Sequence, residues 1–310
     1  MSLDPKIAEI LEAQEAAGMP PLHELGAEQA RAATSRPPAT EPAMHRVYDV
    51  HLEGAGPDRL DVRVLQPSAV SRGVILYVHG GGWVVGSIDS STSLGRNLAK
   101  ASGYTVVIVG YRKAPEHPYP TPLEDCWTAL LWAADHVEKL SGRPGPLVLL
   151  GDSSGGNLAA LVAIRARDHG APLVSLQVLI YPVTDCDLER TAYLDPEKQL
   201  IVTRDTMRWF WDQYLPDKAK RSDPEVSPLH ADLAGLPPTV LVTAEYDLLG
   251  EEADAYGDAL EAAGVAVTRR HFEGQAHGFF SMVGVLPAQV VASDYVASVI
   301  SGRTTARGAR

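Results

Sequence analysis

The stretch PLVLLGDSSGG, residues 146–156, determines more of the fold than any other part of the chain. Its apolar first half is typical of a strand that is buried on both faces of a parallel sheet. Its second half is a GxSxG sequence centred on Ser153, and the helical segment NLAALVAIRA follows directly. A strand, a sharp turn and a helix in this order predict that the Ser153 hydroxyl stands above the carboxyl end of the strand.

Strands and helices alternate along most of the remaining chain. Apolar runs that predict buried strands lie within 73–83, 104–112, 146–156, 175–182, 238–247 and 266–274, and those in 73–83 and 146–156 stop at glycine-rich sequence. A half-solvated hairpin is predicted at 47–52 and 60–65, with Gly54, Gly56 and Pro57 between its strands. Helices are predicted at 94–102, 122–138, 157–169, 249–263 and 287–300. This alternation predicts a doubly wound α/β fold, whose ligand site lies at the carboxyl ends of the parallel strands.

Two segments depart from this alternation. Residues 1–44 contain a short amphipathic helix at 4–17 and a second helical segment near 25–33, which indicates a covering arm or a linker. Residues 183–235 hold no strand pattern but include an aromatic helix, TRDTMRWFWDQYL, at 203–215. An insertion of this length between core strands is usually functional, so we expect a lid.

Composition and charge narrow the classes of function. The net charge of −12, from 27 Lys and Arg against 39 Asp and Glu, disfavours binding to nucleic acid. Cys126 and Cys186 are too few for a disulfide framework and are expected to be reduced thiols. Acidic residues near the N-terminus argue against a signal peptide, and no apolar stretch approaches the ~18 residues of a membrane span. We therefore expect a cytoplasmic protein without a membrane span.

A serine hydroxyl needs a base, and the base needs a carboxylate to orient it. His277 follows the last predicted strand in GQAHGFF, and Asp247 ends the strand PTVLVTAEYD. The chain order Ser153, Asp247, His277 is the order of nucleophile, acid and base in hydrolases of this fold. Asp247 could instead cap the following helix, or serve both as the acid and as the cap. Other histidines are expected to be structural or solvated: His45, His51, His136, His169 and His271.

The sequence HGGGW, residues 79–83, also follows a buried strand. Successive glycines can turn backbone N–H groups inward, and with the N–H of Ser154 they would bind the oxyanion of a tetrahedral intermediate. His79 is expected to anchor this loop through a hydrogen bond. An anion-binding loop for a phosphate ligand is the alternative, although neither GxxxxGK[ST] nor GxGxxG accompanies it.

Taken together, HGGGW, YRKAPEHPYP (111–120), GDSSGG, YDLLGEE (246–252) and AHGF (276–279) resemble the hormone-sensitive-lipase-like branch of the α/β-hydrolases, bacterial esterase family IV, over about residues 45–300. The resemblance implies an eight-stranded, mostly parallel sheet flanked by helices and a carboxylic-ester hydrolase that uses no cofactor or metal. It further implies a triad of Ser153, Asp247 and His277, and oxyanion N–H groups from Gly81, Gly82 and Ser154.

The resemblance also implies a division of the chain. The predicted parts are an N-terminal arm that belongs to a cap (1–44), a first part of the catalytic core (45–182), a cap insertion (183–235), a second part of the core (236–302) and a frayed tail (303–310). Ser154 stands where the family pattern usually has Ala, and Leu248 where it usually has Pro. The Ser154 side chain is expected to add a hydroxyl near the ester without disturbing the backbone donors.

Two further groups of residues are interpreted from this pattern. Candidate walls of the substrate pocket are aromatic or long apolar side chains that could equally be simple core: Trp83, Met207, Phe210 and Trp211. If they line the pocket, it is apolar and short, and suits short- to medium-chain esters. The proline-rich stretch from Arg112 to Pro120 is expected to be scaffold, with Glu116 bracing the glycine loop.

Several alternative functions stay open at this point. A trypsin-like protease is disfavoured because that fold is all-β and places its serine last. A non-catalytic small-molecule receptor on the same fold is disfavoured by the presence of His277. An amidase or deacetylase on N-acyl substrates would use the same triad. Metal-dependent hydrolysis is disfavoured because no HExxH is present. The expected partner is a small-molecule ester, and a homo-oligomer is left open.

Overall fold

A computed structural model describes residues 2–53, 60–170 and 174–302. The predicted hairpin turn at Gly54, Gly56 and Pro57 and the predicted frayed tail at 303–310 lie outside these residues. At the centre is one sheet of eight strands, in the order β1-β2-β4-β3-β5-β6-β7-β8. Its strands are β1 (Arg46–Leu52), β2 (Leu60–Gln66), β3 (Val74–Val78), β4 (Thr105–Gly110), β5 (Leu147–Asp152), β6 (Leu176–Ile180), β7 (Thr239–Tyr246) and β8 (Val267–Ala276).

The pairing pattern confirms the predicted α/β fold. Strands β1, β2 and β4 pair antiparallel, whereas the pairs from β4 through β3 to β8 are parallel. Every residue of β3 and β5 is buried, as expected for strands covered on both faces. The predicted hairpin is also present, with Leu52 opposite Leu60 and Arg46 opposite Gln66.

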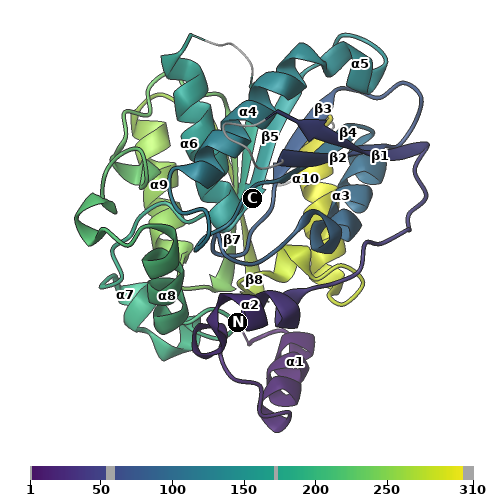
Figure 1. Cartoon of the computed structure of the whole chain (residues 1–310). Helices are drawn as coiled ribbons and strands as arrows, with labels where there is room; N and C mark the ends of the chain where they lie inside the picture. Colours follow the sequence, from purple (N-terminus) through teal and green to yellow (C-terminus); the bar gives the residue numbers. More distant parts are fainter. Residues whose placement is uncertain (1, 54–59, 171–173, 303–310) are drawn as a thin grey trace.

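Helices cover both faces of the sheet (Figure 1). One face carries α3 (Ile88–Ser102) and α10 (Pro287–Ile300), which pack against each other, and the other carries α4 (Thr121–Asp135), α6 (Ser154–Asp168) and α9 (Gly250–Ala262). A short helix, α5 (Val137–Ser141), follows α4. The apolar side chains accordingly form two clusters, one on each side of the sheet. This double layer fixes the carboxyl ends of the parallel strands at one end of the molecule.

Two predicted helix boundaries are wrong, each for a local reason. Helix α3 begins at Ile88 and not at 94, because Ser87 and Ser90 form a reciprocal capping box ahead of it. The helix predicted at 122–138 ends at Asp135, where the His136 ring nitrogen Nδ1 lies 2.8 Å from the carbonyl oxygen of Trp132. The backbone N–H of His136 bonds to Ala133 instead, which ends the α-helical pattern.

The arm and the insertion lie together at one end of the molecule. The arm forms α1 (Pro5–Ala16) and α2 (Leu22–Thr34). The insertion forms α7 (Thr191–Leu194) and α8 (Arg204–Tyr214). It also contains the single-turn 3₁₀ helices η1 (Pro196–Lys198), η2 (Lys218–Lys220) and η3 (Pro228–His230). A further 3₁₀ helix outside the insertion, η4 (Phe279–Ser281), follows β8. Helix α2 packs against α8, and both lie with α1 and α7 in the lower part of Figure 1.

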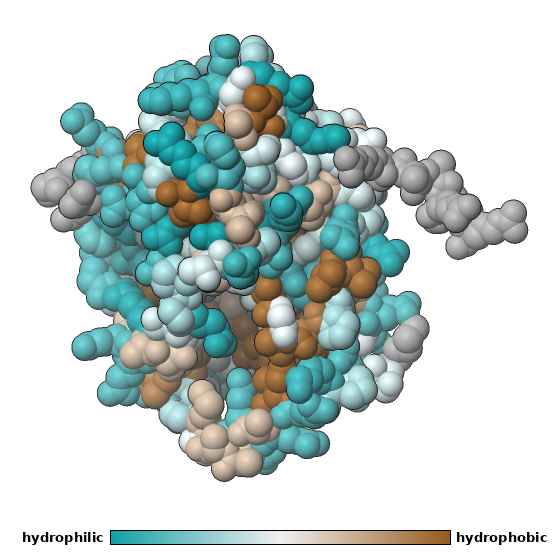
Figure 2. Space-filling view, turned by 90° about the vertical axis from the view of Figure 1, so that its right-hand side faces the viewer, coloured by the Kyte–Doolittle hydropathy of each residue, from teal (hydrophilic) through white to brown (hydrophobic). Residues whose placement is uncertain are grey.

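The outer surface is mixed in character. Figure 2 shows hydrophilic residues over much of one side of the molecule, with hydrophobic residues gathered beside a recess in its lower half. Within the described ranges, no helix combines the length and the hydropathy that crossing a membrane requires.

Candidate active site

Ser153 lies at the turn between β5 and α6, with backbone angles φ 55° and ψ −122°. A positive φ is unfavourable for a residue with a Cβ atom, and such strain is concentrated at functional sites. Two backbone hydrogen bonds hold the turn: the Ser153 N–H donates to Ile180 O (2.9 Å), and the Val183 N–H donates to Ser153 O (3.2 Å). The side chain of Ser153 is therefore fixed at the carboxyl ends of β5 and β6.

Helix α6 passes very close to the sheet beside this turn. A Cβ atom on Gly155 would lie 2.2 Å from the carbonyl oxygen of Val78 and 2.5 Å from that of His79. Any side chain at this position would push α6 away from β3 and from the glycine loop that follows it. The last glycine of the GxSxG sequence is therefore required by this close approach.

His277 and Asp247 meet Ser153 in one chain of hydrogen bonds. The His277 Nε2 atom lies 3.0 Å from Ser153 Oγ, and its Nδ1 atom lies 2.8 Å from Asp247 Oδ2. Because the carboxylate only accepts, Nδ1 carries the proton, which leaves Nε2 to accept the Ser153 hydroxyl proton. The Asp247 residue is 2 % exposed and His277 is 6 % exposed. The predicted nucleophile, base and acid are thus brought together.

The surroundings fix the orientation of His277 and Asp247. The Tyr181 ring packs against the imidazole of His277, with 4.6 Å between ring centroids. The second carboxylate oxygen of Asp247 accepts a hydrogen bond from the Leu249 N–H (2.9 Å). Helix α9 begins at Gly250 with Leu249 as its capping residue, so Asp247 is not the helix cap that the sequence allowed.

The glycine loop after β3 has an unusual backbone. Gly81, Gly82 and Trp83 have φ of 126°, 57° and 59°, three successive positive values. Among the described residues, none accepts a hydrogen bond from the N–H of Gly81, Gly82 or Ser154. Since α6 begins at Ser154, the positive end of its dipole also faces this region. The site therefore offers unpaired backbone donors to a negative charge.

His79 anchors this loop, as predicted. Its Nδ1 atom lies 2.8 Å from Gly80 O, and its ring stacks on Tyr111 with centroids 4.5 Å apart. Burial lowers the pKa of His79 to about 3, with a smaller contribution from Lys113. The imidazole is therefore neutral and serves as a packing element of the loop.

Asp152, directly before Ser153, is a residue whose role the sequence analysis missed. Its Oδ1 atom accepts hydrogen bonds from the Tyr77 hydroxyl (2.8 Å) and the Gly80 N–H (3.0 Å). Burial raises its pKa, while the two donors and the nearby His277 oppose that rise. The carboxyl thus ties the turn at Ser153 to the start of the glycine loop. An acidic residue at the end of an apolar strand, directly before the serine, is the signal in the sequence that could have identified it.

The four predicted pocket residues are all buried, and three of them pack against one another or against the glycine loop. Trp83 and Trp211 have ring centroids 4.7 Å apart, and Trp83 also stacks on Tyr214 at 4.3 Å. A Cβ atom on Gly82 would lie 2.2 Å from the ring of Phe210, so that ring packs directly on the loop. Met207 is buried on the same helix. Whether these side chains contact a substrate stays a prediction.

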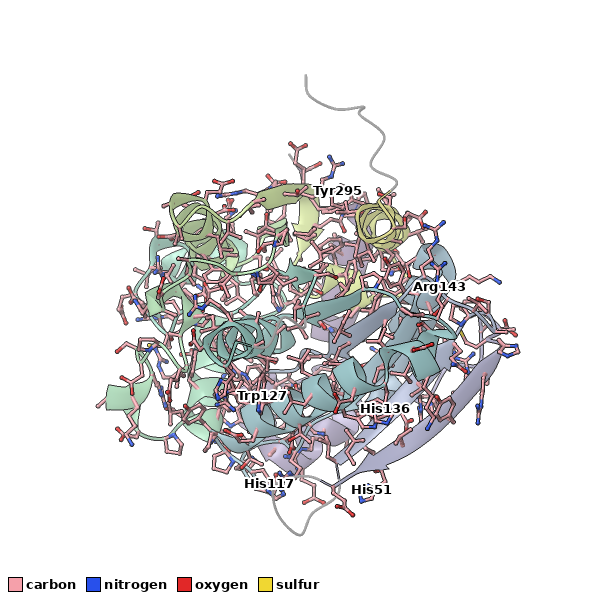
Figure 3. The ribbon with its side chains drawn as sticks, turned by 90° about the horizontal axis from the view of Figure 1, so that it is seen from above. His51, His117, Trp127, His136, Arg143 and Tyr295 are labelled. Carbon is pink, nitrogen blue, oxygen red and sulfur yellow. The ribbon has the colours of Figure 1, made fainter. Side chains whose placement is uncertain are left out.

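The other histidines lie outside this arrangement. Figure 3 places His51 and His117 at the periphery of the molecule. The Nδ1 atom of His51 is 3.0 Å from Asp61 Oδ1, that of His169 is 2.9 Å from Arg165 O, and that of His271 is 3.0 Å from the Thr243 hydroxyl. These contacts fit the structural or solvated roles that the sequence analysis predicted.

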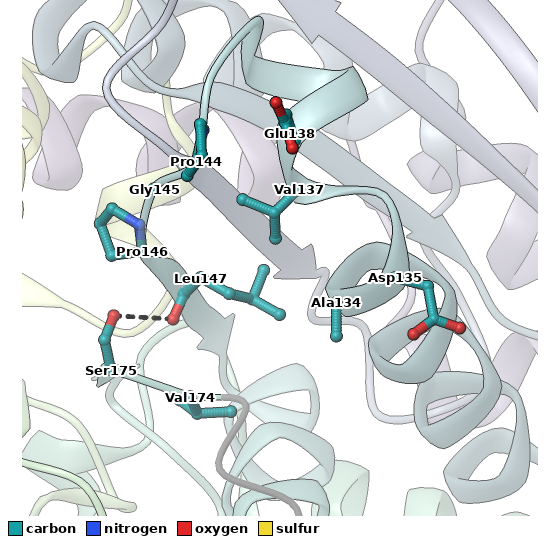
Figure 4. Close-up of a pocket in the computed structure, with 10 residues that line it drawn as sticks. All are labelled: Ala134, Asp135, Val137, Glu138, Pro144, Gly145, Pro146, Leu147, Val174 and Ser175. Atoms are coloured by element: carbon teal, nitrogen blue, oxygen red, sulfur yellow. Dashed lines mark hydrogen bonds between the residues drawn. The ribbon is translucent and has the colours of Figure 1, made fainter.

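A hollow of about 500 Å³ lies at the opposite end of the sheet (Figure 4). Its wall includes the start of β5 and the end of α4, with Ser175 donating a hydrogen bond to Leu147 O (2.8 Å). Because it lies at the amino ends of β5 and β6, none of the three triad side chains lines it. Its position argues against a role in the chemistry of Ser153.

Arg31 of helix α2 is another residue that the sequence analysis missed. Its Nε atom donates to Val84 O (2.9 Å), and its NH2 nitrogen donates to Ala114 O (2.7 Å). The same guanidinium holds both carboxylate oxygens of Glu116, at 2.9 and 2.5 Å. Glu116 was expected to brace the glycine loop; among the described residues its carboxylate bonds to Arg31, which in turn bonds to Val84, directly after the loop.

Comparisons with known proteins give matches over most of the chain. A family model described as alpha/beta hydrolase fold matches residues 75–281. The chain is 36% identical over 277 residues to the carboxylesterase NlhH of Mycobacterium tuberculosis, covering 86% of each chain. It is also 36% identical over 304 residues to an ethyl acetate hydrolase of Pseudomonas putida, covering 92% of this chain and 94% of that one.

A solved structure of an esterase is also similar to this chain. The hyperthermophilic esterase of the archaeon Pyrobaculum calidifontis superposes with a TM-score of 0.89 and 35% sequence identity. The match covers 98% of this chain and 99% of that one. The similarity therefore extends over the arm and the insertion as well as the sheet.

Proposed function

Because this chain belongs to the alpha/beta hydrolase fold family, we propose that it is a carboxylic-ester hydrolase that works through an acyl-enzyme on Ser153. The observation that carries the proposal is the hydrogen-bonded chain from Ser153 through His277 to Asp247, with distances of 3.0 and 2.8 Å. A serine in this relation to a histidine and a carboxylate is an activated nucleophile.

Acylation follows from these positions. His277 Nε2 takes the Ser153 proton while Ser153 Oγ forms a bond to the ester carbonyl carbon, and the carbonyl oxygen becomes an oxyanion. The imidazolium then gives its proton to the ester oxygen, the carbon–oxygen bond breaks and the alcohol leaves. Asp247 keeps the imidazole in the required tautomer and stabilises its positive charge.

Deacylation repeats these steps with water. His277 takes a proton from the water, whose oxygen bonds to the acyl carbon. The proton passes to Ser153 Oγ as its bond to the acyl carbon breaks, and a carboxylic acid is released. In both halves of the reaction the oxyanion is held by the N–H groups of Gly81, Gly82 and Ser154. Such preorganised donors each contribute about 10²–10³ in rate in serine hydrolases.

We propose short- to medium-chain esters as substrates. Trp83, Met207, Phe210 and Trp211 would form an apolar wall beside the glycine loop, and Phe210 packs directly against Gly82. A bulky ring so close to the reacting centre limits the length of chain that can be accommodated on that side. The Pseudomonas putida relative, named for hydrolysis of ethyl acetate, supports a short acyl group.

The arm (1–44) and the insertion (183–235) are proposed to form a cap over this site, with 45–182 and 236–302 as the catalytic core. Several contacts support the division. The His23 Nδ1 atom lies 3.0 Å from the Thr206 hydroxyl, so the arm bonds to helix α8. The amide of Gln275, two residues before His277, donates to Asp4 of the arm (3.0 Å).

A chain-length series of nitrophenyl esters, with a matched nitroanilide, tests the substrate assignment. We expect the highest kcat/KM for short acyl chains, a decline with longer chains, and much slower turnover of the anilide. Equal or faster turnover of the anilide would point to an amidase. Absence of turnover of every ester by a folded protein would contradict the proposed function.

A further inference from the structure

The serine that follows the nucleophile makes a contact that its side chain alone can supply. The Trp83 N–H donates a hydrogen bond to Ser154 Oγ at 3.2 Å, and both residues are fully buried. Ser154 opens helix α6, and Trp83 ends the glycine loop. A side-chain bond therefore joins the two segments whose backbones carry the proposed oxyanion donors. The hydroxyl bonds to the glycine loop, and its expected position near the ester stays a prediction.

The loop needs such a restraint because its backbone is strained. Trp83 has a φ of 59°, in the left-handed region that a tryptophan rarely adopts. Its carbonyl oxygen accepts from the Ala114 N–H (3.0 Å), and its ring stacks on Tyr214. Only the bond to Ser154 Oγ fixes its N–H, since no other acceptor for that group is present in the described part of the chain.

A second buried hydroxyl holds the beginning of the loop. The Tyr111 hydroxyl donates to His79 O (2.8 Å), and the Tyr111 ring stacks on that of His79. Burial raises the pKa of Tyr111, so the phenol remains a donor. The segment from His79 to Trp83 is therefore held at its start by Tyr111 and at its end by Ser154.

The residues on either side of Ser153 thus hold the loop at two points. Asp152 holds the N–H of Gly80, and Ser154 holds the N–H of Trp83. The N–H groups of Gly81 and Gly82 lie between these two fixed points and are left unpaired among the described residues. The spacing of the free donors from Ser153 is therefore set by the two side chains that flank it.

We propose that the Ser154 hydroxyl is a positioning group that holds the N–H groups of Gly81 and Gly82 in register with the N–H of Ser154. The inference rests on the proposed function and assigns to this side chain a part in organising the oxyanion site. The backbone of Ser154 touches the oxyanion, whereas its hydroxyl acts only through the loop.

Ser154→Ala removes the hydroxyl at the start of a helix, where alanine is well tolerated. We expect kcat to fall about 10-fold with little change in KM, less than the 10²–10³ that follows outright loss of an oxyanion donor. The inhibition constant of a short alkyl trifluoromethyl ketone, which forms a tetrahedral adduct with serine, should rise by the same factor as kcat falls. Ser154→Cys, with a weaker acceptor of similar size, should give a kcat between those of the wild type and the alanine variant.

Ser102→Ala is the matched control. Ser102 is the buried last residue of α3 and lies outside the active site. Its hydroxyl accepts a hydrogen bond from the Tyr104 N–H at 3.2 Å, the same distance as between Trp83 N and Ser154 Oγ. Both alanine variants should lower Tm, but only Ser154→Ala should change kcat and the ketone affinity. An unchanged kcat in Ser154→Ala, a loss confined to KM, or an equal loss in Ser102→Ala would overturn the inference.

The failure of this inference can be told apart from the failure of the proposed function. If Ser153→Ala abolishes ester hydrolysis while Ser154→Ala keeps wild-type kcat, only the role of the Ser154 hydroxyl is lost. If Ser153→Ala keeps wild-type activity, the proposed function fails and this inference fails with it. Should Ser154→Ala not fold, the kcat of Ser154→Cys decides: a value equal to that of the wild type contradicts the proposal.

Discussion

The turn at Ser153 and the contact made by Arg31 hold the same glycine loop in different ways. At the turn, buried backbone groups and the glycine at 155 leave no room for adjustment: a Cβ atom there would lie 2.2 Å from a carbonyl oxygen. At the other side, one long arginine side chain, 30% exposed, reaches from helix α2 to Val84, Ala114 and Glu116. The first contact fixes the reacting atoms, whereas the second attaches the arm.

The two contacts have different consequences for catalysis. Rigid backbone contacts are placed where a fraction of an ångström affects the rate. Exposed side-chain contacts are placed where a covering segment must be attached. Changes at the turn and the triad should therefore alter kcat strongly, and changes in the arm should alter stability with a smaller effect on kcat.

The largest expected effect is on the triad itself. Ser153→Ala, His277→Ala and the double variant should each lower kcat by roughly 10⁶, because the residues act as one unit and the second loss adds nothing. Steady-state hydrolysis of a short nitrophenyl ester measures all three. Losses that add up in the double variant would mean that Ser153 and His277 act independently.

Replacing a glycine of the glycine loop and a glycine of the arm compares the effects of the two regions on kcat. Gly82→Ala places a Cβ atom 2.2 Å from Phe210, at a φ of 57°, and displaces a proposed oxyanion donor. We expect kcat to fall about 10²–10³-fold. Gly26→Ala in the arm also adds a Cβ at positive φ, 72°, but with no atom within 4 Å. Because its ψ of 165° places it in a region that is open essentially to glycine alone, the alanine should lower the free energy of unfolding by about 1–3 kcal/mol and leave kcat unchanged. Similar kcat values for the two variants would contradict the distinction.

A buried carboxyl that bonds to the insertion predicts how the stability of the protein depends on pH. Glu252 of α9 accepts hydrogen bonds from the Thr184 N–H (2.8 Å) and the Tyr193 hydroxyl (3.1 Å). Burial raises its pKa from 4.5 to about 8. Between these values the folded protein keeps a proton that the unfolded chain has released, so the free energy of unfolding falls as pH rises through this window.

Glu252→Gln tests this prediction, since the amide oxygen can still accept from the Thr184 N–H and the amide nitrogen can donate to the Tyr193 hydroxyl oxygen, without titrating. Urea unfolding should show the wild type losing up to about 1.4 kcal/mol per pH unit relative to the variant between pH 5 and pH 8, as expected for one titrating group. Above pH 8 the free energies of unfolding of the wild type and of the variant should change with pH in parallel. If the two free energies of unfolding change with pH in parallel from pH 5 to pH 8, Glu252 does not titrate in this range.

The smallest effects are expected at the arm. Arg31→Ala removes hydrogen bonds to two backbone carbonyls and should lower the free energy of unfolding by about 1–3 kcal/mol. Glu116→Gln removes only a partly exposed ion pair and should lower it by less than about 1 kcal/mol. Arg31 holds the pKa of Glu116 at about 2. Denaturant midpoints of the two variants give the comparison; a larger loss in Glu116→Gln would show that the carboxylate, and not the carbonyls, is the main partner.

The sequence predicted the sheet and the grouping of Ser153, Asp247 and His277 because both depend on local signals. Uninterrupted apolar runs mark buried strands, and residues that follow parallel strands lie at one edge of the sheet. The five motifs also predicted membership of the hormone-sensitive-lipase-like esterases, which the family match and the 36% identical carboxylesterase confirm.

The sequence did not predict the contacts of Arg31 or of Ser154. Arg31 joins carbonyl oxygens 53 and 83 residues away, and backbone acceptors leave no mark in a sequence. Ser154 was noticed as a departure from the family pattern, but the direction of its hydroxyl depends on the positive φ of Trp83. Such long-range side-chain geometry follows from the fold and cannot be derived from periodicity or spacing.

Reaction with a fluorophosphonate, followed by mapping of the modified peptide, tests the central claim most directly. An activated serine attacks the phosphorus and keeps the group, whereas an ordinary serine does not react. We predict one label per chain at Ser153 in the wild type, and none in His277→Ala. A folded wild-type protein that takes up no label, or carries it at another residue, would contradict this account.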